Sequence, residues 1–391
     1  MKFDFDKVVD RHGTKCLKYD FAKERGRSDD MLPLWVADMD FQTAPGIQKS
    51  LSDAVAHGIY GYSEGKDDYF QAAAGWYEKY FGWKVEKEWL IKTPGVVFAL
   101  AMAVKAYTKE GDAVLLQQPV YYPFSEVITD NHRRLINSPL QQIDGHYEIN
   151  FEEFEQKIVE ENVKLFLMCS PHNPVGRVWK EWELRKIGDI CLKHNVLVVS
   201  DEIHSDFTYG ENIHHVFASL DEKYAAITTT CTAPSKTFNI AGLQISNIWI
   251  SNPELRARFR AEVTAAGYSQ VNLMGLVACQ AAYETGEEWL KELKTYLEGN
   301  LDYVRTFLKE NLPEIKLTEP EGTYLLWLDF KSLGMKEEQL KDLVENKAKL
   351  WLDSGAMFGP DGEGFERINI ACPREILKQA LTQLAESVHD R

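Results

Sequence analysis

The chain has 391 residues, 45% hydrophobic and 27% charged, which is close to the average for globular proteins and argues against wholesale disorder. There are 44 Lys and Arg residues against 60 Asp and Glu, and the formal net charge of −16 argues against a protein that grips nucleic acid or an anionic membrane by charge. At roughly 150 residues per domain, the length predicts two or three domains, or one large α/β domain with a smaller partner.

The cysteines and the first residues bear on where the protein works. The six cysteines are spread thinly and never form a CxxC pair, so we interpret them as reduced thiols. The opening MKFDFDKVVDRHG lacks the apolar core of a secretory signal. No uncharged apolar run approaches the roughly 20 residues of a membrane helix. We therefore expect a soluble, cytoplasmic protein with no membrane partner, no nucleic-acid partner and no metal.

The middle of the chain alternates short apolar runs with amphipathic stretches. The runs that predict buried strands are residues 113–117, 165–169, 196–200, 225–230 and 245–250. Between several of them lie helical patterns such as EWELRKIGDICLKH at 181–194. Alternation of strands and helices predicts βαβ units, and therefore an α/β fold with a mainly parallel sheet flanked by helices.

The C-terminal part predicts a second, smaller α+β unit. Its expected elements are a helix at 289–310, a strand at 323–330, a helix at 336–347, a strand at 367–371 and a helix at 373–389. The first residues show little periodicity. We expect residues 1–45 to form an arm and part of the small domain, 46–287 the large domain, and 288–391 the small domain.

Three segments place polar residues directly after predicted strands. They are SPHNPVGR at 170–177, DEIH at 201–204 and PSKTFN at 234–239. In open α/β sheets ligands bind beyond the carboxyl ends of the strands, so these segments predict one site. A desolvated Lys236 could form a Schiff base, Asp201 could keep a pyridine nitrogen protonated, and Asn173 could donate to the ring oxygen. Pyridoxal 5′-phosphate (PLP) needs these three interactions.

The three motifs, in this order, resemble those of the PLP enzymes of the aspartate-aminotransferase fold. More narrowly, the chain resembles the MalY/PatB-type cystathionine β-lyases through WVADMDF at 35–41, GYSEG at 61–65, SKTFNIAGLQ at 235–244 and GPDGEGFERINIACPR at 359–374. The resemblance covers nearly the whole chain. It implies a large PLP-binding domain, a smaller domain and a homodimer with shared active sites.

The resemblance also implies roles for single residues at the ring and the substrate. Lys236 matches the lysine that bonds to the cofactor, Asp201 the partner of the ring nitrogen and Asn173 the donor to the ring oxygen. Tyr121 matches the aromatic residue stacked on the ring. Arg367 matches the arginine that grips the substrate carboxylate, since its fork suits a bidentate contact. Ala37 and Asn173 would also contact the substrate.

The phosphate is expected at a helix N-terminus that begins after Thr93-Pro94. Backbone N–H groups of Gly95, Val96 and Val97, together with the helix dipole, would hold it. Ser235 and Thr232 could add hydroxyl contacts. By the resemblance, Tyr62 would reach the phosphate from the neighbouring subunit.

Two positions depart from the aminotransferase pattern and agree with the lyase subgroup. His204 stands where aminotransferases usually carry a tyrosine, and it is expected to line the cofactor pocket. Gln244 stands where they usually carry an arginine that neutralises the phosphate. The phosphate would then depend more on helix amides and hydroxyls.

Each candidate also has a plain structural interpretation. Asp201 could be a helix cap, Asn173 a turn residue before Pro174, and Tyr121 and Tyr62 core or interface aromatics. The joint order of the motifs favours the functional interpretation, which is a carbon–sulfur β-lyase acting on L-cystathionine or related cysteine S-conjugates. The alternatives are an aminotransferase on the same fold and a regulatory protein-binding role alongside catalysis.

Overall fold

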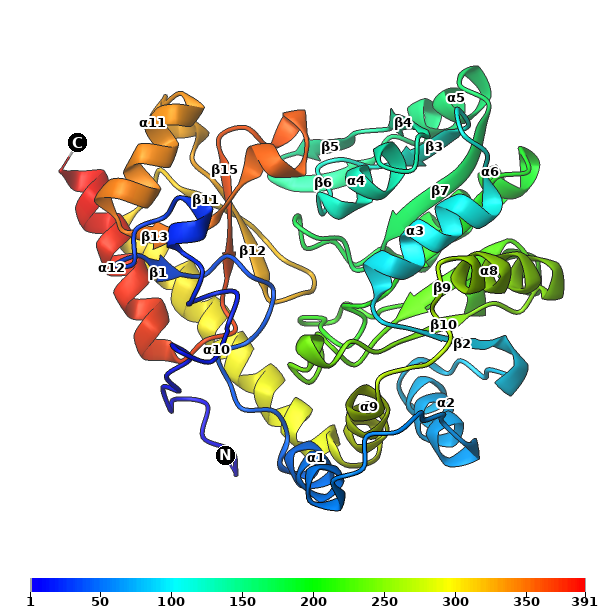
Figure 1. Ribbon diagram of the computed structural model, residues 1–391. Coiled ribbons are helices and arrows are strands. Elements are labelled where there is room, and N and C mark those ends of the chain that lie inside the picture. Colours follow the sequence, from blue (N-terminus) through cyan, green and yellow to red (C-terminus); the bar gives the residue numbers. More distant parts are fainter. Residues whose placement is uncertain (1, 391) are drawn as a thin grey trace.

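A seven-stranded sheet forms the larger part of the molecule in the computed structural model, which describes residues 2–390 (Figure 1). In spatial order the strands are β2 (Leu90–Thr93), β10 (Ser246–Trp249), β9 (Thr228–Thr232), β8 (Leu197–Asp201), β7 (Val163–Cys169), β3 (Ala113–Leu116) and β4 (Arg134–Asn137). All neighbouring strands pair in parallel except β10, which is antiparallel to both of its neighbours. The prediction of a mainly parallel sheet is confirmed.

Helices cover both faces of this sheet because its central strands are apolar on both sides. Leu165 and Leu167 of β7 pack into a core shared with α3 (Val96–Tyr107), α4 (Pro123–Thr129) and α8 (Pro253–Ala265). Phe166 and Met168, which alternate with them, pack into the opposite core. That core includes α5 (Phe151–Glu160), α6 (Glu181–Lys193) and α7 (Glu222–Ala225). Burial on both faces explains the continuous apolar run of the strand.

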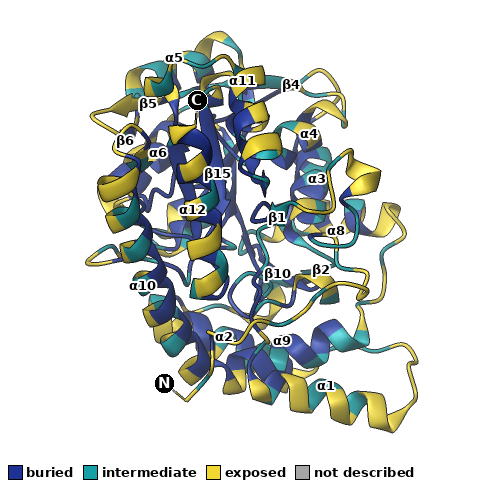
Figure 2. Cartoon of the chain, turned by 90° about the vertical axis from the view of Figure 1, so that its left-hand side faces the viewer, coloured by how far each residue is buried: buried dark blue, intermediate teal, exposed yellow. Residues whose placement is uncertain are grey.

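A second, four-stranded antiparallel sheet lies beside the first (Figure 1). Its strands are β11 (Lys316–Thr318), β12 (Leu325–Asp329), β15 (Phe365–Asn369) and β14 (Asp353–Ser354). The helices of this part are the long α10 (Glu287–Asn311), α11 (Glu337–Lys341), which a π-helical turn continues, and α12 (Arg374–His389). In Figure 2 the strand β15 is buried, whereas α10 and α12 expose one face each.

The N-terminal residues join this smaller part through a short parallel pairing of β1 (Leu32–Pro33) with β13 (Leu350–Trp351). The remaining elements are α1 (Pro45–His57), α2 (Asp67–Phe81), α9 (Leu273–Thr285) and the hairpin of β5 (Leu140–Ile143) with β6 (His146–Ile149). The division of the chain into residues 1–45, 46–287 and 288–391 stays a prediction. None of the helices within residues 2–390 combines the length and apolar composition that crossing a membrane requires.

One predicted strand begins later than expected. The run 225–230 was expected to be extended throughout, but Ala225 ends α7 and β9 starts only at Thr228. The side chain of Asp221 caps α7 by accepting from the Lys223 N–H, so the helix takes up the first residue of the apolar run.

Candidate active site

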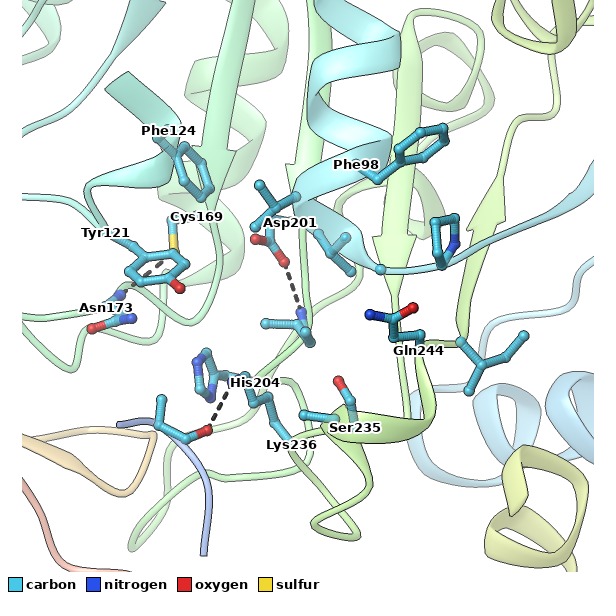
Figure 3. Close-up of a pocket in the computed structure, with 18 residues that line it drawn as sticks. Phe98, Tyr121, Phe124, Cys169, Asn173, Asp201, His204, Ser235, Lys236 and Gln244 are labelled. Carbon is cyan, nitrogen blue, oxygen red and sulfur yellow. Dashed lines mark hydrogen bonds between the residues drawn. The ribbon is translucent and has the colours of Figure 1, made fainter. Parts of the chain in front are cut away.

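A cavity of about 430 Å³ opens at the carboxyl ends of the parallel strands (Figure 3). Its walls come from the N-terminus of α3, the segments after β3, β7, β8 and β9, and the N-terminal segment at Ala37. Of the sequence-predicted residues, those that line it are Ala37, Gly95, Val96, Val97, Tyr121, Asn173, Asp201, His204, Ser235 and Lys236. Four neighbouring strands of the sheet therefore present the residues at or after their carboxyl ends to one cavity.

Asp201 forms the floor of the cavity at the end of β8. The neighbouring strands place Cys169 on one side of it and Cys231 on the other. The residue is only 6% exposed, and one carboxylate oxygen accepts a hydrogen bond from the Ile203 N–H at 3.1 Å (Figure 3). Burial raises the pKa of Asp201 to about 7, because no cation lies in contact with the carboxylate. Asp201 is therefore a buried acid ready to pair with a cationic group.

Lys236 enters the cavity from the turn that follows β9. Its ammonium donates to the Ala37 carbonyl at 2.7 Å, which holds the side chain over the cavity (Figure 3). Burial lowers the pKa of Lys236 to about 8, and the charge of Arg367 acts in the same direction, against Asp38 and Asp201. At pH 7 a lysine with this pKa is about one-tenth neutral, far more than an ordinary lysine. The neutral amine is the form that attacks a carbonyl or takes a proton.

Asn173 connects the cavity to Arg367 on β15. The guanidinium of Arg367 donates to Asn173 Oδ1 at 3.0 Å and to the Trp35 carbonyl at 2.9 Å. Arg367 lies just outside the set of residues that line the cavity, directly behind Asn173. Tyr121 is anchored to the same loop, since its N–H donates to the Asn173 carbonyl at 3.0 Å. The structure thus brings together Tyr121, Asn173 and Arg367, which were predicted to contact the ring face, the ring oxygen and the substrate carboxylate.

The end of the cavity near α3 has the features of an anion site. Val96 and Val97 are the first residues of a 12-residue helix, and their N–H groups point out of its N-terminus. Ser235 and Gln244 line the same end (Figure 3). Gln244 is neutral and adopts a left-handed conformation with φ of 51°, so no arginine from this position adds charge.

The structure does not bring two of the predicted residues to the cavity. Thr232 is fully buried in β9, where its hydroxyl donates to the Asn247 carbonyl at 2.8 Å and accepts from Trp249 Nε1 at 3.0 Å. Its hydroxyl is thus occupied within the sheet. Tyr62 is 94% exposed and lies away from the cavity of its own chain, so its expected contact with a neighbouring subunit stays a prediction.

His204 lines the cavity as a neutral imidazole. Burial lowers its pKa to about 3, and the charges of Lys236 and Arg367 act in the same direction. Its Nδ1 is buried and has no hydrogen-bond partner within residues 2–390. The ring packs edge-on against Tyr324, with 5.9 Å between centroids. His204 can therefore donate or accept one hydrogen bond toward a ligand, but it does not carry charge.

Sequence reasoning missed Asp353, which pairs with Arg367. The two residues stand opposite each other in the register of β14 and β15, and their side chains form a buried ion pair. Burial raises the pKa of Asp353 against the lowering effect of Arg367. A signal for this partner was present in the LDSGAMF sequence next to the recognised glycine-rich motif, but sequence spacing alone could not reveal that β14 pairs with β15.

The N-terminal segment from Trp35 to Phe41 lies across the site and is held from two sides. From the small sheet, Asn369 Nδ2 donates to the carbonyls of Val36 and Asp38 at 2.6 Å each. From the Lys236 turn, Asn239 Nδ2 donates to the Met39 and Phe41 carbonyls at 2.8 Å. The predicted motif WVADMDF is thus a strap that both parts of the molecule hold in place.

The sheet order, the lysine after β9 and the buried aspartate after β8 define an aspartate-aminotransferase-like fold with its site at the carboxyl edge. The chain belongs to the aminotransferase class I and II family, whose family model matches residues 30–384. The resemblance inferred from the sequence is confirmed.

Individual relatives narrow the likeness further. The chain is 43% identical to cystathionine beta-lyase PatB of Bacillus subtilis (strain 168), over 97% of this chain and 98% of that protein. It is 33% identical to protein MalY of Escherichia coli (strain K12), over 99% of both chains. The crystal structure of cystalysin from Treponema denticola, which contains a pyridoxal 5′-phosphate cofactor, matches with a TM-score of 0.96 and 39% identity over 100% of both chains.

Proposed function

We propose that this protein is a PLP-dependent carbon–sulfur β-lyase that cleaves L-cystathionine or related cysteine S-conjugates to a thiol, pyruvate and ammonia. The observation that carries this proposal is the presence of Lys236, with its pKa of about 8, and the uncompensated Asp201 in one cavity. The likeness to PatB, named a cystathionine beta-lyase, and to PLP-containing cystalysin supports it.

The side chains present fit PLP at each of its polar groups. The buried Asp201 carboxylate suits a protonated pyridine nitrogen, and Asn173 suits the ring oxygen. The N-terminus of α3 and the Ser235 hydroxyl suit the phosphate. Tyr121 offers an aromatic face at the cavity wall. When bound, PLP supplies the electron sink for a carbanion at the substrate Cα.

The residues of this chain bind the substrate and transfer the proton. Arg367 binds the substrate α-carboxylate, and Asn173 and Asp353 hold its guanidinium in position. Neutral Lys236 takes the Cα proton on its Nζ. The β-carbon–sulfur bond breaks, the thiolate leaves with the bonding pair, and the remaining three-carbon fragment is hydrolysed to pyruvate and ammonia. Proton transfer by a positioned side chain is worth typically 10²–10⁴-fold in rate.

The second candidate is an aminotransferase on the same fold, in which Lys236 returns the proton to the cofactor instead. The neutral Gln244 favours the lyase, because a transaminase must keep its cofactor through a stage without a covalent bond to lysine. A lyase needs no such stage and tolerates weaker phosphate anchoring.

The test is a paired measurement on one preparation of the holoenzyme. Pyruvate and free thiol from L-cystathionine are assayed without any 2-oxo acid, and 2-oxo acid is assayed from aspartate with 2-oxoglutarate as acceptor. We expect elimination to be faster by at least ~10-fold, equivalent to about 1.4 kcal/mol of barrier. Equal rates, or faster transamination, would favour the aminotransferase.

The proposed enzyme acts as a homodimer with shared active sites. Large apolar side chains are strongly exposed at the end of α1 and in the segment after it, namely Val55, Ile59, Tyr60 and Tyr62. An exposed apolar group of this kind is typical of an interaction surface. Mixing Tyr62→Phe subunits with Lys236→Ala subunits should restore part of the activity through hybrid sites. A fully active monomer in light scattering would refute the dimer.

We also propose a cytoplasmic location. All six cysteines are free, and five of them are buried. Reduced thiols are the usual state in that compartment, which supports the proposal.

A further inference from the structure

A second cavity of about 470 Å³ lies behind the segment that carries His204. The segment after β8 separates the two spaces, since His204 lines the first cavity whereas Ser205 and Asp206 line the second. The rest of the lining comes from the end of α2, the segment 212–214 and one face of α10. This volume lies within the usual range for small-molecule sites.

Lys294 is the residue of this cavity that most directly indicates the charge of a ligand. It is half-buried on α10, and burial lowers its pKa. Within residues 2–390 its ammonium makes no hydrogen bond and no ion pair. The nearby Lys79, by contrast, pairs with Glu287 at 2.6 Å. The Asp206 and Glu298 carboxylates attract this ammonium without being hydrogen-bonded to it. A partly desolvated ammonium that lacks a hydrogen-bond partner suits a carboxylate ligand.

Two carboxylates of the cavity, those of Glu298 and Asp206, suit a ligand that also carries a positive group. Glu298, one turn further along α10, also has no hydrogen bond or ion pair among the described residues. The Asp206 carboxylate faces the same space and accepts from Trp76 Nε1 at 3.0 Å and from Thr237 Oγ1 at 2.6 Å. A third lining carboxylate, Glu287, is paired with Lys79. The two ammonium groups of Lys291 and Lys294 therefore balance the two remaining carboxylates, which favours a zwitterion over a simple anion.

Apolar side chains complete the lining and define the body of the ligand. They are Tyr80, Phe81, Ile213 and Leu290. We propose that this cavity binds an α-amino acid with an apolar side chain, with its carboxylate on Lys294 and its ammonium on Glu298 and Asp206. The site is separate from the catalytic cavity, and through the Asp206–Thr237 hydrogen bond it contacts the residue that follows Lys236.

The experiment measures binding of L-phenylalanine to the holoenzyme by equilibrium dialysis, while the visible spectrum of the cofactor reports the catalytic cavity separately. The variant is Lys294→Met, and the matched control is Lys309→Met, an exposed lysine on the same helix. We expect Lys294→Met to weaken the dialysis-detected site by at least about tenfold and to leave the spectral titration unchanged. We expect Lys309→Met to change neither.

Two further probes and one further variant test the zwitterion. Glu298→Gln should also weaken L-phenylalanine binding, and 3-phenylpropionate and 2-phenylethylamine, which each lack one charge, should bind more weakly than L-phenylalanine. Binding to Lys294→Met that equals wild type overturns the second site. The separate use of the cofactor spectrum rests on the proposed function. Lys294-dependent binding without any cofactor spectrum would overturn that function and leave the site intact.

Discussion

Two charged clusters follow the same strand, β7, only four residues apart, and they differ in how far their hydrogen bonds are satisfied. Around Arg177, the guanidinium donates to both carboxylate oxygens of Glu183 at 3.0 and 2.9 Å and to Glu321 at 2.8 Å. A carbonyl, that of Tyr147, accepts a further bond. Around Asn173, by contrast, Asp201 has no cation in contact and His204 Nδ1 has no partner among the described residues.

The difference separates a scaffold from a binding site. The Arg177 cluster is complete without any ligand, and it joins the loop after β7 to α6 and to the segment before β12. The cavity keeps Asp201, His204 and Lys236 without a counter-charge in contact, and burial shifts their pKa values toward the neutral forms. Buried polar groups are normally satisfied, and His204 Nδ1 is not. Together with three shifted pKa values in one cavity, this indicates a binding site whose ligand supplies the missing partners.

The largest expected effect comes from Lys236→Ala. The variant should lose at least about 10⁴-fold in pyruvate formation from L-cystathionine, about 5.5 kcal/mol of barrier, because the proton acceptor is removed. The visible absorbance that depends on the lysine–cofactor bond should also disappear. Lys109→Ala, an exposed lysine, serves as the control. A cofactor bond still reducible by borohydride in the variant would refute the assignment.

Arg177→Met should instead damage stability. Removal of the cation leaves the Glu183 and Glu321 carboxylates with backbone N–H donors, from Lys180 and Val178, but with no positive charge beside them. Breaking a buried ion pair in this way costs about 3–5 kcal/mol of unfolding free energy. The control Arg185→Met removes an exposed pair with Glu181 and should cost less than about 1 kcal/mol. Urea unfolding of the two variants gives the comparison. Equal losses would show that the Arg177 cluster is not the scaffold described here.

Asp201→Asn should reduce activity without reducing stability, which is the reverse of Arg177→Met. We expect activity to fall about 10²-fold while the cofactor stays bound, since an amide cannot keep a ring nitrogen protonated. In the cofactor-free protein, the raised pKa of Asp201 lowers stability as pH rises from about 4 to 7, and the full penalty is present above pH 7. The variant lacks this penalty and should be at least as stable as wild type at pH 8. Activity within a few-fold of wild type would exclude the role.

The smallest expected effect concerns pH. Lys236 with a pKa of about 8 is mostly protonated at pH 7 and mostly neutral at pH 9. The rate at which the cofactor-free protein binds PLP covalently should therefore rise about tenfold between these values. Stopped-flow absorbance measures it. A rate that keeps rising steeply to pH 10 would mean that the amine has an ordinary lysine pKa.

The sequence predicted the fold and the shared location of Asn173, Asp201 and Lys236 because strand order and post-strand position determine both. Their chemical roles stay predictions until the variants are tested. Thr232 shows a limit of this reasoning, since its motif position suggested the phosphate but its hydroxyl bonds within the sheet to Asn247 and Trp249. Asp353 shows another, because its pairing with Arg367 depends on strand register.

The second cavity was even less predictable from the sequence than the pairing of Asp353 with Arg367. Its charged residues Asp206, Lys294 and Glu298 come from a loop and from a helix more than 80 residues later, and no motif joins them. Only the packing of α10 against the segment after β8 brings them together. A pattern of ordinary surface charges in the sequence becomes a site through tertiary structure alone.

The strap from Trp35 to Phe41 has a mechanical consequence. Arg367 and Asn369 hold its first half to the small sheet, and Lys236 and Asn239 hold it to the cofactor side. A change in the angle between the large and the small sheet would stretch these hydrogen bonds. A hinge therefore cannot lie within 36–39 without breaking several of them. The Lys236 bond to Ala37 is the one that the proposed chemistry itself releases when the amine takes up another partner. Ligand binding would thereby remove one attachment of the strap, at Ala37, and leave the hydrogen bonds from Arg367, Asn369 and Asn239 in place.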